Sequence, residues 1–313
     1  MRKDKRLLLA KAIQNLVFKA SAGTGEDNTG ANLTQSELLG QILRPDWAEG
    51  TIYARCNIYD VSDKANGVKM PIVKETVRTI AGGILGGFIA YPIAEGVPVT
   101  LTRGKLDQST LQLNQVCVGV RVTNALLEDA TYLEQCLSKG LEEALKYYLD
   151  SYILYGSGVT TCNGILDATG NRATGTVTMT SPFAEADYKS IVGKYYGGEK
   201  GCWVMSRNSW LRTAALYSST FPLRFGDKGN AFLFGYPVIV KTDMASGGIV
   251  LGDFSQYFLG QKPMREEISE HLYFESNESV FRAIIRVNGM PSWYGGVITQ
   301  DAVTTVYPFV AGA

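Results

Sequence analysis

Residues 126–166 read LLEDATYLEQCLSKGLEEALKYYLDSYILYGSGVTTCNGIL. Thr131 and Glu134 have the spacing of a capping box, in which each end residue satisfies a backbone donor of the other. Apolar residues then recur three or four positions apart, the period of one helix face, at Leu133, Leu137, Leu141, Ala144, Leu145, Tyr148, Leu149 and Tyr152. Gly156 follows Tyr155 as a stop signal. This pattern predicts a helix over 131–155, about 37 Å long, which serves as a structural spine.

Downstream of this helix, residues 181–262 alternate helical and strand patterns. Pro182 precedes a helix with Gly197 and Gly198 beyond its end, and SRNSWLRTAALY predicts a second helix. Short apolar strands are predicted in GCWVMS, FGYPVIV and GGIVLGDF. We therefore expect a mixed sheet covered by helices.

The last fifty residues are typical of β structure. MREEISEHLYF and SVFRAIIRVNG flank a short polar turn made of Glu275, Ser276, Asn277 and Glu278. This spacing predicts a long hairpin over 264–289, and AVTTVYPF adds a final strand. The lone histidine, His271, alternates within the first strand and is interpreted as an ordinary strand residue.

Upstream of the helix, TIYARCNIYDV and GVKMPIV predict two strands joined by a turn at Asp63, Asn66 and Gly67. Residues 71–110 then lose the core pattern, and LTRGKLDQSTLQL regains alternation. We interpret this region as a long two-stranded excursion with a flexible apolar tip. The stretch 79–94 is uncharged, yet it is shorter than the roughly 20 residues of a membrane helix and carries four glycines and a proline.

Exposed apolar surface usually marks a protein interface, so the tip is predicted to contact a partner. The candidate interface residues are Gly82, Gly83, Ile84, Leu85, Gly86, Gly87, Phe88 and Ile89. Glycines let a backbone approach its partner closely. The alternative is an internal, buried β-hairpin.

The first fifty residues predict a helix followed by an adaptable arm. Residues 5–20 have an apolar face, and the basic residues around it are Arg2, Lys3, Lys5, Arg6, Lys11 and Lys19. The next segment, SAGTGEDNTGANLT, is too polar to form a core. The basic face could bind a neighbouring acidic surface, touch DNA phosphates or be solvated.

Composition excludes several classes of function. The chain of 313 residues has 30 basic and 30 acidic residues, so it lacks the excess positive charge of a dedicated nucleic-acid binder. One histidine removes His-rich metal centres, and five dispersed cysteines predict reduced, mostly buried thiols. GGILGG and GSG fit no nucleotide-binding loop, and no G-x-S-x-G motif occurs. The sequence thus predicts no catalytic residue, no cofactor and no metal site, which leaves a soluble α/β enzyme as a weak alternative.

Residues 50–313, taken in order, resemble the major capsid protein family of tailed phages. The resemblance is carried by Leu126, Leu127, Glu128 and Asp129, by Tyr155, Gly156, Gly158, Gly164 and Ile165, and by Arg282 with Arg286. It implies an α+β fold with an N-terminal arm (1–50) and an extended loop (71–115). A peripheral domain would comprise 51–70, 116–180 with the spine helix, and the hairpin at 263–300, whereas 181–262 and the strand in 301–313 would form an axial domain.

The same resemblance implies a non-enzymatic subunit that forms hexamers and pentamers of an icosahedral shell around double-stranded DNA. Cement, scaffolding and portal proteins would be its other partners, with non-specific DNA contact and no membrane. Assembly would occur in the host bacterial cytoplasm and the product would be the virion capsid. An encapsulin-like nanocompartment that holds protein cargo is the alternative, and the long arm and glycine-rich loop favour the phage shell.

Some shells of this family cross-link a loop lysine to an asparagine with help from a glutamate. Lys74 and Lys105 lie in the predicted loop. The strand position after Arg286 reads Val287 and Asn288, so the expected carboxylate is missing. We therefore predict non-covalent packing of the loop.

Overall fold

The computed structural model describes residues 51–62, 64–129, 133–167, 173–216, 221–226, 231–299 and 304–312. Contacts divide the chain into two units, Met1–Pro45 and Asp46–Ala313, and every element below belongs to the second. The predicted N-terminal helix, the arm and their six basic residues lie outside the described residues, as does Thr131 of the predicted capping box.

One sheet has five strands, with β13 at its centre. It contains β1 (Asn57–Asp60), β4 (Asn114–Thr123), β11 (Tyr257–Gln261), β12 (Arg265–Tyr273) and β13 (Glu278–Pro291). The predicted hairpin is confirmed, because β12 and β13 pair antiparallel around η4 (Phe274–Ser276). β4 pairs with β13 from Glu278 to Val287, so β11 and β12 follow one another along the opposite edge of β13.

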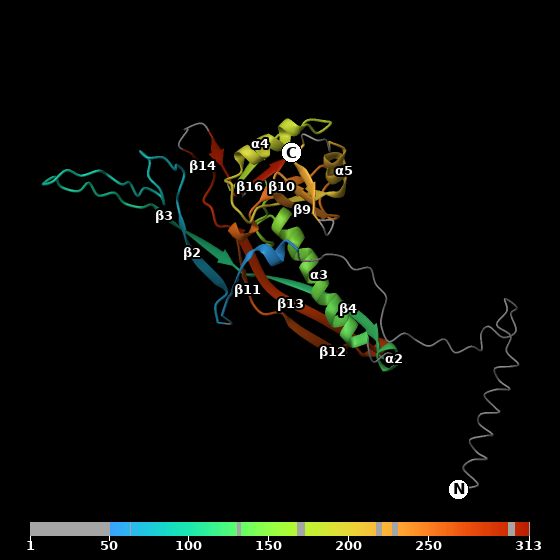
Figure 1. Cartoon of the computed structure of the whole chain (residues 1–313). Coiled ribbons are helices and arrows are strands. Elements are labelled where there is room, and N and C mark those ends of the chain that lie inside the picture. Colours follow the sequence, from blue (N-terminus) through green and yellow to red (C-terminus); the bar gives the residue numbers. More distant parts are fainter. Residues whose placement is uncertain are drawn as a thin grey trace, which may run out of the picture. The chain divides into compact units, whose positions relative to one another are not determined.

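The second sheet has seven strands and is covered by helices, as the sequence predicts (Figure 1). Its order is β5 (Thr174–Val177), β16 (Phe309–Gly312), β10 (Ile249–Gly252), β6 (Cys202–Ser206), β9 (Tyr236–Lys241), β8 (Ala231–Leu233) and β7 (Leu223–Phe225). The helices α4 (Glu185–Lys194) and α5 (Arg207–Ala215) accompany it. Tyr188, Ile191 and Trp203 are completely buried and form the centre of this core.

The spine helix α3 (Leu133–Tyr155) packs on the five-stranded sheet through β4 and β13. Leu141, Leu145 and Leu149 are at most 3% exposed, which confirms the centre of the predicted apolar face, whereas Tyr148 is 47% exposed and lies outside it. The same core cluster includes Val250 and Phe309 of the seven-stranded sheet, so α3 joins the cores of both sheets. A short helix, α2 (Asn124–Asp129), precedes α3 and was not predicted.

The predicted excursion contains a two-stranded sheet. β2 (Gly67–Val73) pairs antiparallel with β3 (Leu106–Gln112), and the chain between them, residues 74–105, is called the loop from here on. Figure 1 shows the loop projecting away from the two larger sheets. A further two-stranded sheet, β14 (Val297–Ile298) with β15 (Thr305–Val306), lies beside its base.

Several local predictions are corrected by the structure. Tyr53–Arg55 is a 3₁₀ helix, η2, instead of part of a strand. The two strands that follow do not pair with one another, because β1 runs parallel to β11 and β2 pairs with β3. The strands β7 and β8 were missed, since each has only three residues.

The predicted segment boundaries also shift. β11 falls within the predicted segment 181–262 but belongs to the five-stranded sheet, and β5 falls within 116–180 but belongs to the seven-stranded sheet. The ends of the predicted excursion at 71 and 115 lie inside β2 and β4. These memberships depend on strand partners outside each segment, such as β13 for β11 and β16 for β5, and no local pattern reveals them.

Candidate assembly surfaces

The base of the loop is held firmly by the body of the protein. Arg78 N–H donates to the Ile298 carbonyl at 2.8 Å, and Ile298 N–H donates to the Thr76 carbonyl at 3.0 Å. The Lys74 ammonium lies 4.6 Å from the centre of the Tyr294 ring. A chain that leaves the body through such paired contacts has a defined direction.

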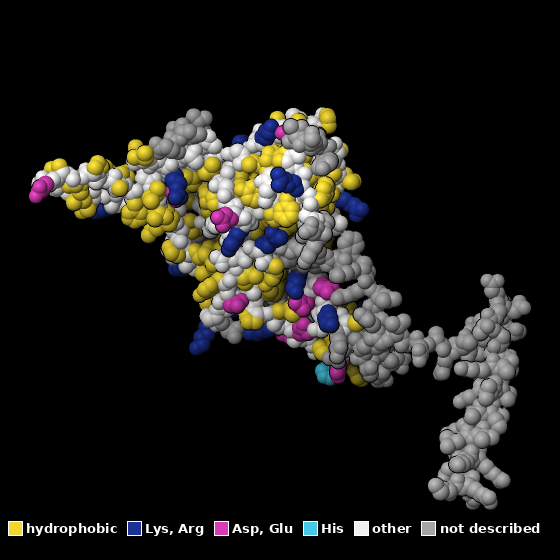
Figure 2. Space-filling view, in the orientation of Figure 1, with side chains coloured by type: hydrophobic (Ala, Val, Ile, Leu, Met, Phe, Trp, Pro, Cys, Tyr) yellow, Lys and Arg dark blue, Asp and Glu magenta, His cyan; other side chains and the backbone are white. Residues whose placement is uncertain are grey.

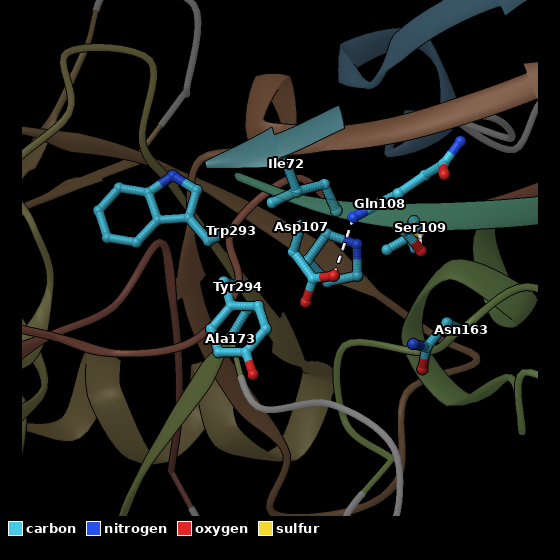
Figure 3. A pocket seen from close by; sticks show the side chains of 10 residues that line it. Ile72, Asp107, Gln108, Ser109, Asn163, Ala173, Trp293 and Tyr294 are labelled. Atoms are coloured by element: carbon cyan, nitrogen blue, oxygen red, sulfur yellow. Dashed lines mark hydrogen bonds between the residues drawn. The ribbon is translucent and has the colours of Figure 1, made fainter. Parts of the chain in front are cut away.

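A pocket lies beside this base, between β2, β3 and the segment that follows β13. Figure 3 shows Trp293 and Tyr294 toward one end of the pocket and Ser109 and Asn163 toward the other, with Asp107 between them. The Asp107 carboxylate accepts a hydrogen bond at 2.8 Å from the backbone N–H of the next residue in β3, Gln108. In the described part of the chain, no group of three or more His, Cys, Asp or Glu could hold a metal ion.

The glycine-rich segment of the loop folds back on itself. Phe88 N–H donates to the Ile84 carbonyl at 2.8 Å, and Lys105 N–H donates to the Gly86 carbonyl at 3.0 Å. Gly86 has a φ of +78°, and a Cβ there would lie 2.7 Å from the Lys105 carbonyl oxygen. The prediction that residues 82–89 form the tip of the loop is therefore wrong, because tight turns hold them near Lys105.

The distal end of the loop is a turn at residues 94–97. Val97 N–H donates to the Ala94 carbonyl at 3.2 Å, and Gly96 has a φ of +80°. In Figure 1 the turquoise part of the loop reaches farthest from the sheets. Glu95 lies in this turn and is the only charged residue between Arg78 and Arg103.

The loop exposes many large apolar side chains. Ile80 is 81% exposed and Leu101 is 87% exposed, and Figure 2 shows hydrophobic side chains along the whole projection. Of the eight predicted interface residues, Ile84, Leu85 and Phe88 are exposed large hydrophobics, whereas Gly83 is buried against Phe88. Such a surface is unusual on a monomer and is typical of a contact with another protein.

The turn of the β12–β13 hairpin is partly occupied by contacts within the subunit. Asn277 adopts a left-handed conformation, and its carbonyl accepts from Asn124 N–H at 3.0 Å. The Glu278 carboxylate forms an ion pair with Arg121 at 3.1 Å. Asn277 and Glu278 thus contact α2 and β4, whereas the other two predicted interface residues, Glu275 and Ser276, are exposed.

Phe274 is the functional candidate that the sequence prediction missed at this turn. Its side chain is 81% exposed at the end of β12, next to the predicted polar residues. An aromatic residue directly before a polar turn is the signal that would have identified it.

A buried ion pair connects α3 to the seven-stranded sheet. The Lys241 ammonium of β9 lies 2.7 Å from the Asp150 carboxylate of α3, and their side chains are 6% and 0% exposed. The second Asp150 oxygen accepts from the Tyr53 N–H at 2.8 Å. Sequence analysis missed this pair, although a carboxylate between Leu149 and Ile153 on an apolar helix face is its signal.

The cysteines are free, and three of them are buried, in agreement with the prediction of mostly buried thiols. Burial raises the pKa of Cys202 to about 11 and that of Cys162 to about 12, so both remain protonated at neutral pH. Cys117 is exposed on β4. His271 is an exposed residue of β12, which confirms its assignment to a strand.

A family model decides what these surfaces belong to. The model described as the phage capsid family matches residues 30–298. The chain belongs to the phage capsid family. As a major capsid protein it is a structural subunit of an icosahedral, homo-oligomeric shell in the virion.

Solved structures share the fold of this capsid protein. The capsid of a native GTA particle is 16% identical, with a TM-score of 0.64 over 87% of this chain and 96% of that chain. Microbacterium phage Oxtober96 gives 16% identity and a TM-score of 0.61 over 90% and 97%, and Mycobacterium phage Adephagia gives 13% and 0.62 over 93% and 98%. A search of curated proteins finds no match.

The resemblance seen in the sequence is thereby confirmed, as is the α+β fold class. The comparisons favour a phage capsid over a nanocompartment. For the capsid protein the relevant sites are surfaces between copies, of which the exposed loop is the largest apolar one described above. Among the described residues, no helix is long and apolar enough to cross a membrane.

Proposed function

We propose that this capsid protein forms hexamers and pentamers that close into a shell around double-stranded DNA. The observation that carries the proposal is the loop, which is anchored at its base and exposes apolar side chains along its length. Burying these side chains on a neighbouring subunit would stabilise the shell by about 25 cal/mol for each Å² removed from water. Because the same loop recurs on every copy, one such contact is repeated around each capsomer.

We assign the two sheets to different domains of the capsid subunit. The five-stranded sheet with α3 corresponds to the peripheral domain, and the seven-stranded sheet with α4 and α5 corresponds to the axial domain around the capsomer centre. We assign β5 to the axial domain and β11 to the peripheral domain, because each strand belongs to the sheet of that domain. The predicted interface residues of the loop and of the hairpin turn at 275–278 belong to the contacts between copies.

The partners of the shell complete the proposal. Scaffolding, cement and portal proteins act on it during or after assembly in the bacterial cytoplasm, and packaged DNA is contacted without sequence specificity. The basic residues at positions 2–19 bind neighbouring subunits first and DNA second. Equal numbers of acidic and basic residues in the chain favour this modest role for DNA contact. We assign the subunit no catalytic step.

The test is expression of the full chain, followed by sedimentation velocity, negative-stain electron microscopy and absorbance of nuclease-treated particles. Closed shells or hexameric capsomers are expected. A small, monodisperse oligomer that never assembles over a range of salt would overturn the proposal. Shells that enclose foreign protein instead of nucleic acid would favour the alternative function, a nanocompartment that holds protein cargo.

A further inference from the structure

The buried ion pair between α3 and β9 contains the groups that a condensation reaction needs. Lys241 Nζ lies 2.7 Å from Asp150 Oδ2, and the two side chains are 6% and 0% exposed. A second carboxylate, Asp243, lies 3.9 Å from the same ammonium, and its side chain is also 6% exposed. An amine, a carboxyl group and an additional carboxylate are therefore held together in the interior of the subunit.

An ion pair on the surface of the same helix provides a contrast. Lys146 and Glu142 lie 2.6 Å apart, but their side chains are 39% and 47% exposed. Water solvates both of these charges, so they gain little from any closer association. The pair of Lys241 with Asp150 combines an equally close contact with the exclusion of water.

The two oxygens of the Asp150 carboxylate have different partners. Oδ2 faces the Lys241 ammonium, whereas Oδ1 accepts from the Tyr53 backbone N–H at 2.8 Å. When an amine attacks a carboxyl carbon, negative charge develops on one oxygen and the other departs as water. The Tyr53 N–H is placed to stabilise that charge on Oδ1, as the donor of an oxyanion hole does. Oδ2 is then the departing oxygen.

Asp243 is placed to accept a proton from Lys241. Its Oδ2 atom is buried and has no hydrogen-bond partner among the residues that the structure describes. A buried oxygen without a donor is destabilising, because it has lost its hydrogen bonds to water. Beside the Lys241 ammonium, the Asp243 carboxylate has a proton donor within reach.

We propose that Lys241 and Asp150 condense to an isopeptide bond that joins the spine helix to the seven-stranded sheet. The ammonium gives one proton to Asp150 Oδ2, and the Nζ lone pair then forms a bond to Cγ. Asp243 takes a second proton from Nζ and passes it to Oδ2, so the C–O bond breaks and its electron pair leaves with the water. The nitrogen keeps one proton as the new amide N–H. No oxidant or cofactor is consumed, and each chain reacts once.

The buried position favours this condensation. Groups held in the right geometry react with an effective concentration on the order of 10⁵ M or more. The product is a neutral amide, which replaces an ammonium and a carboxylate that are both costly to remove from water. The bond joins positions 91 residues apart, so it restricts the unfolded chain and stabilises the fold. It forms within one subunit and goes beyond the proposed function.

Mass spectrometry of the full chain tests the proposal. Folded wild-type protein, denatured before the measurement, should be lighter than its sequence by the mass of one water. Its tryptic digest should contain a branched peptide in which Lys241 is joined to Asp150. Lys146 and Glu142, the exposed pair on the same helix, should appear in unbranched peptides and serve as an internal control.

Two variants separate the roles of the side chains. Lys241→Arg keeps the cation but removes the primary amine, so it should have the full mass of its sequence, with its fold checked by circular dichroism. Assistance by a proton acceptor is worth about 10²–10⁴-fold in rate. Asp243→Asn should therefore leave most freshly made chains unlinked, although the Lys241 amine and the Asp150 carboxylate are both present.

The outcomes are distinct from those of the assembly test. A wild-type chain of full mass, cleaved normally by trypsin after Lys241, would overturn the proposal. Loss of water that maps to a cyclic imide at an aspartate, without a branched peptide, would overturn it as well. If Lys241→Arg does not fold, the presence or absence of the branched peptide in the wild type decides the question. Each of these results is obtained whether or not the chain forms shells.

Discussion

The spine helix and the loop use the same kinds of side chain in opposite environments. Leu141 and Leu145 of α3 are at most 3% exposed, whereas Leu101 of the loop is 87% exposed. Apolar burial folds the subunit in the first region, because Leu141 and Leu145 belong to a core cluster that includes residues of both sheets. In the loop, the apolar side chains are exposed on the subunit, and in the proposed function another copy buries them. Hydrophobicity alone therefore does not locate a core. The position of an apolar segment in the fold decides whether it stabilises the subunit or a contact between subunits.

The largest effect on the subunit itself is expected at Leu141. Leu141→Asp places a carboxylate in the core next to Leu145 and should lower the free energy of unfolding by more than about 4 kcal/mol, leaving little folded protein. Leu137, on the same face, should behave similarly. Circular dichroism during urea denaturation measures the change.

The matched control on the same helix is Lys139→Asp, an exposed position. It should change stability by less than about 0.5 kcal/mol. A folded, stable Leu141→Asp subunit would contradict the assignment of α3 as the shared core of both sheets.

The next largest effect is expected at the buried ion pair. Lys241→Met leaves the Asp150 carboxylate without its cation and should cost about 3–5 kcal/mol. The double variant Lys241→Met/Asp150→Leu should regain part of that stability, since the charge of Asp150 is then no longer buried, whereas the buried Asp243 carboxylate, 3.9 Å from the Lys241 ammonium, keeps its charge. Urea denaturation of the wild type, of Lys241→Met, of Asp150→Leu and of the double variant gives the coupling energy, and additive effects of the two single substitutions would show that the two groups do not interact.

A smaller, pH-dependent effect is expected at Asp187. Hydrogen bonds from the Thr180 hydroxyl and the Ala184 N–H hold the pKa of this carboxyl below its usual value. A lowered pKa means that the stabilisation is present above about pH 4 and is lost as the pH falls through the folded-state pKa. Asp187→Asn should therefore cost about 1 kcal/mol at pH 7 and make stability less dependent on pH between 5 and 3.

Urea denaturation at these pH values measures the difference. Glu199→Gln, at an exposed position, is the control and should leave the pH profile as in the wild type. Equal profiles for Asp187→Asn and wild type would show that the carboxylate does not cap α4.

The smallest effect on stability, but a complete effect on assembly, is expected in the loop. Deleting residues 79–94 removes exposed side chains and keeps the anchor between Thr76, Arg78 and Ile298. The subunit should unfold within about 0.5 kcal/mol of the wild type and should fail to form closed shells. An unfolded product would show that the loop, like α3, is needed to fold the subunit.

Local patterns were sufficient for the spine helix and for the hairpin. Both consist of neighbours in sequence, and their apolar periods of three to four and of two are visible without a partner. The parallel pairing of β1 with β11 could not be predicted, because about two hundred residues separate them and each strand has many equivalent partners. The same holds for β5 and β16.

The candidate surfaces were predicted in part. Composition alone marked the loop as an exposed apolar segment, and exposure of Ile84, Leu85 and Phe88 agrees with that. Whether these residues contact a neighbour remains a prediction. The turn at Ala94–Val97 was not recognised as the distal end, because the glycine pairs at 82–87 suggested flexibility where the structure forms hydrogen-bonded turns.

The position of β16 determines when the seven-stranded sheet can be completed during synthesis. β16 is made of residues 309–312 and lies between β5, made much earlier, and β10. Until those residues leave the ribosome, the sheet consists of a lone strand and a separate group of strands with an open edge between them. The seven-stranded sheet of a nascent chain therefore stays incomplete, with unpaired strand edges, until translation has passed β16.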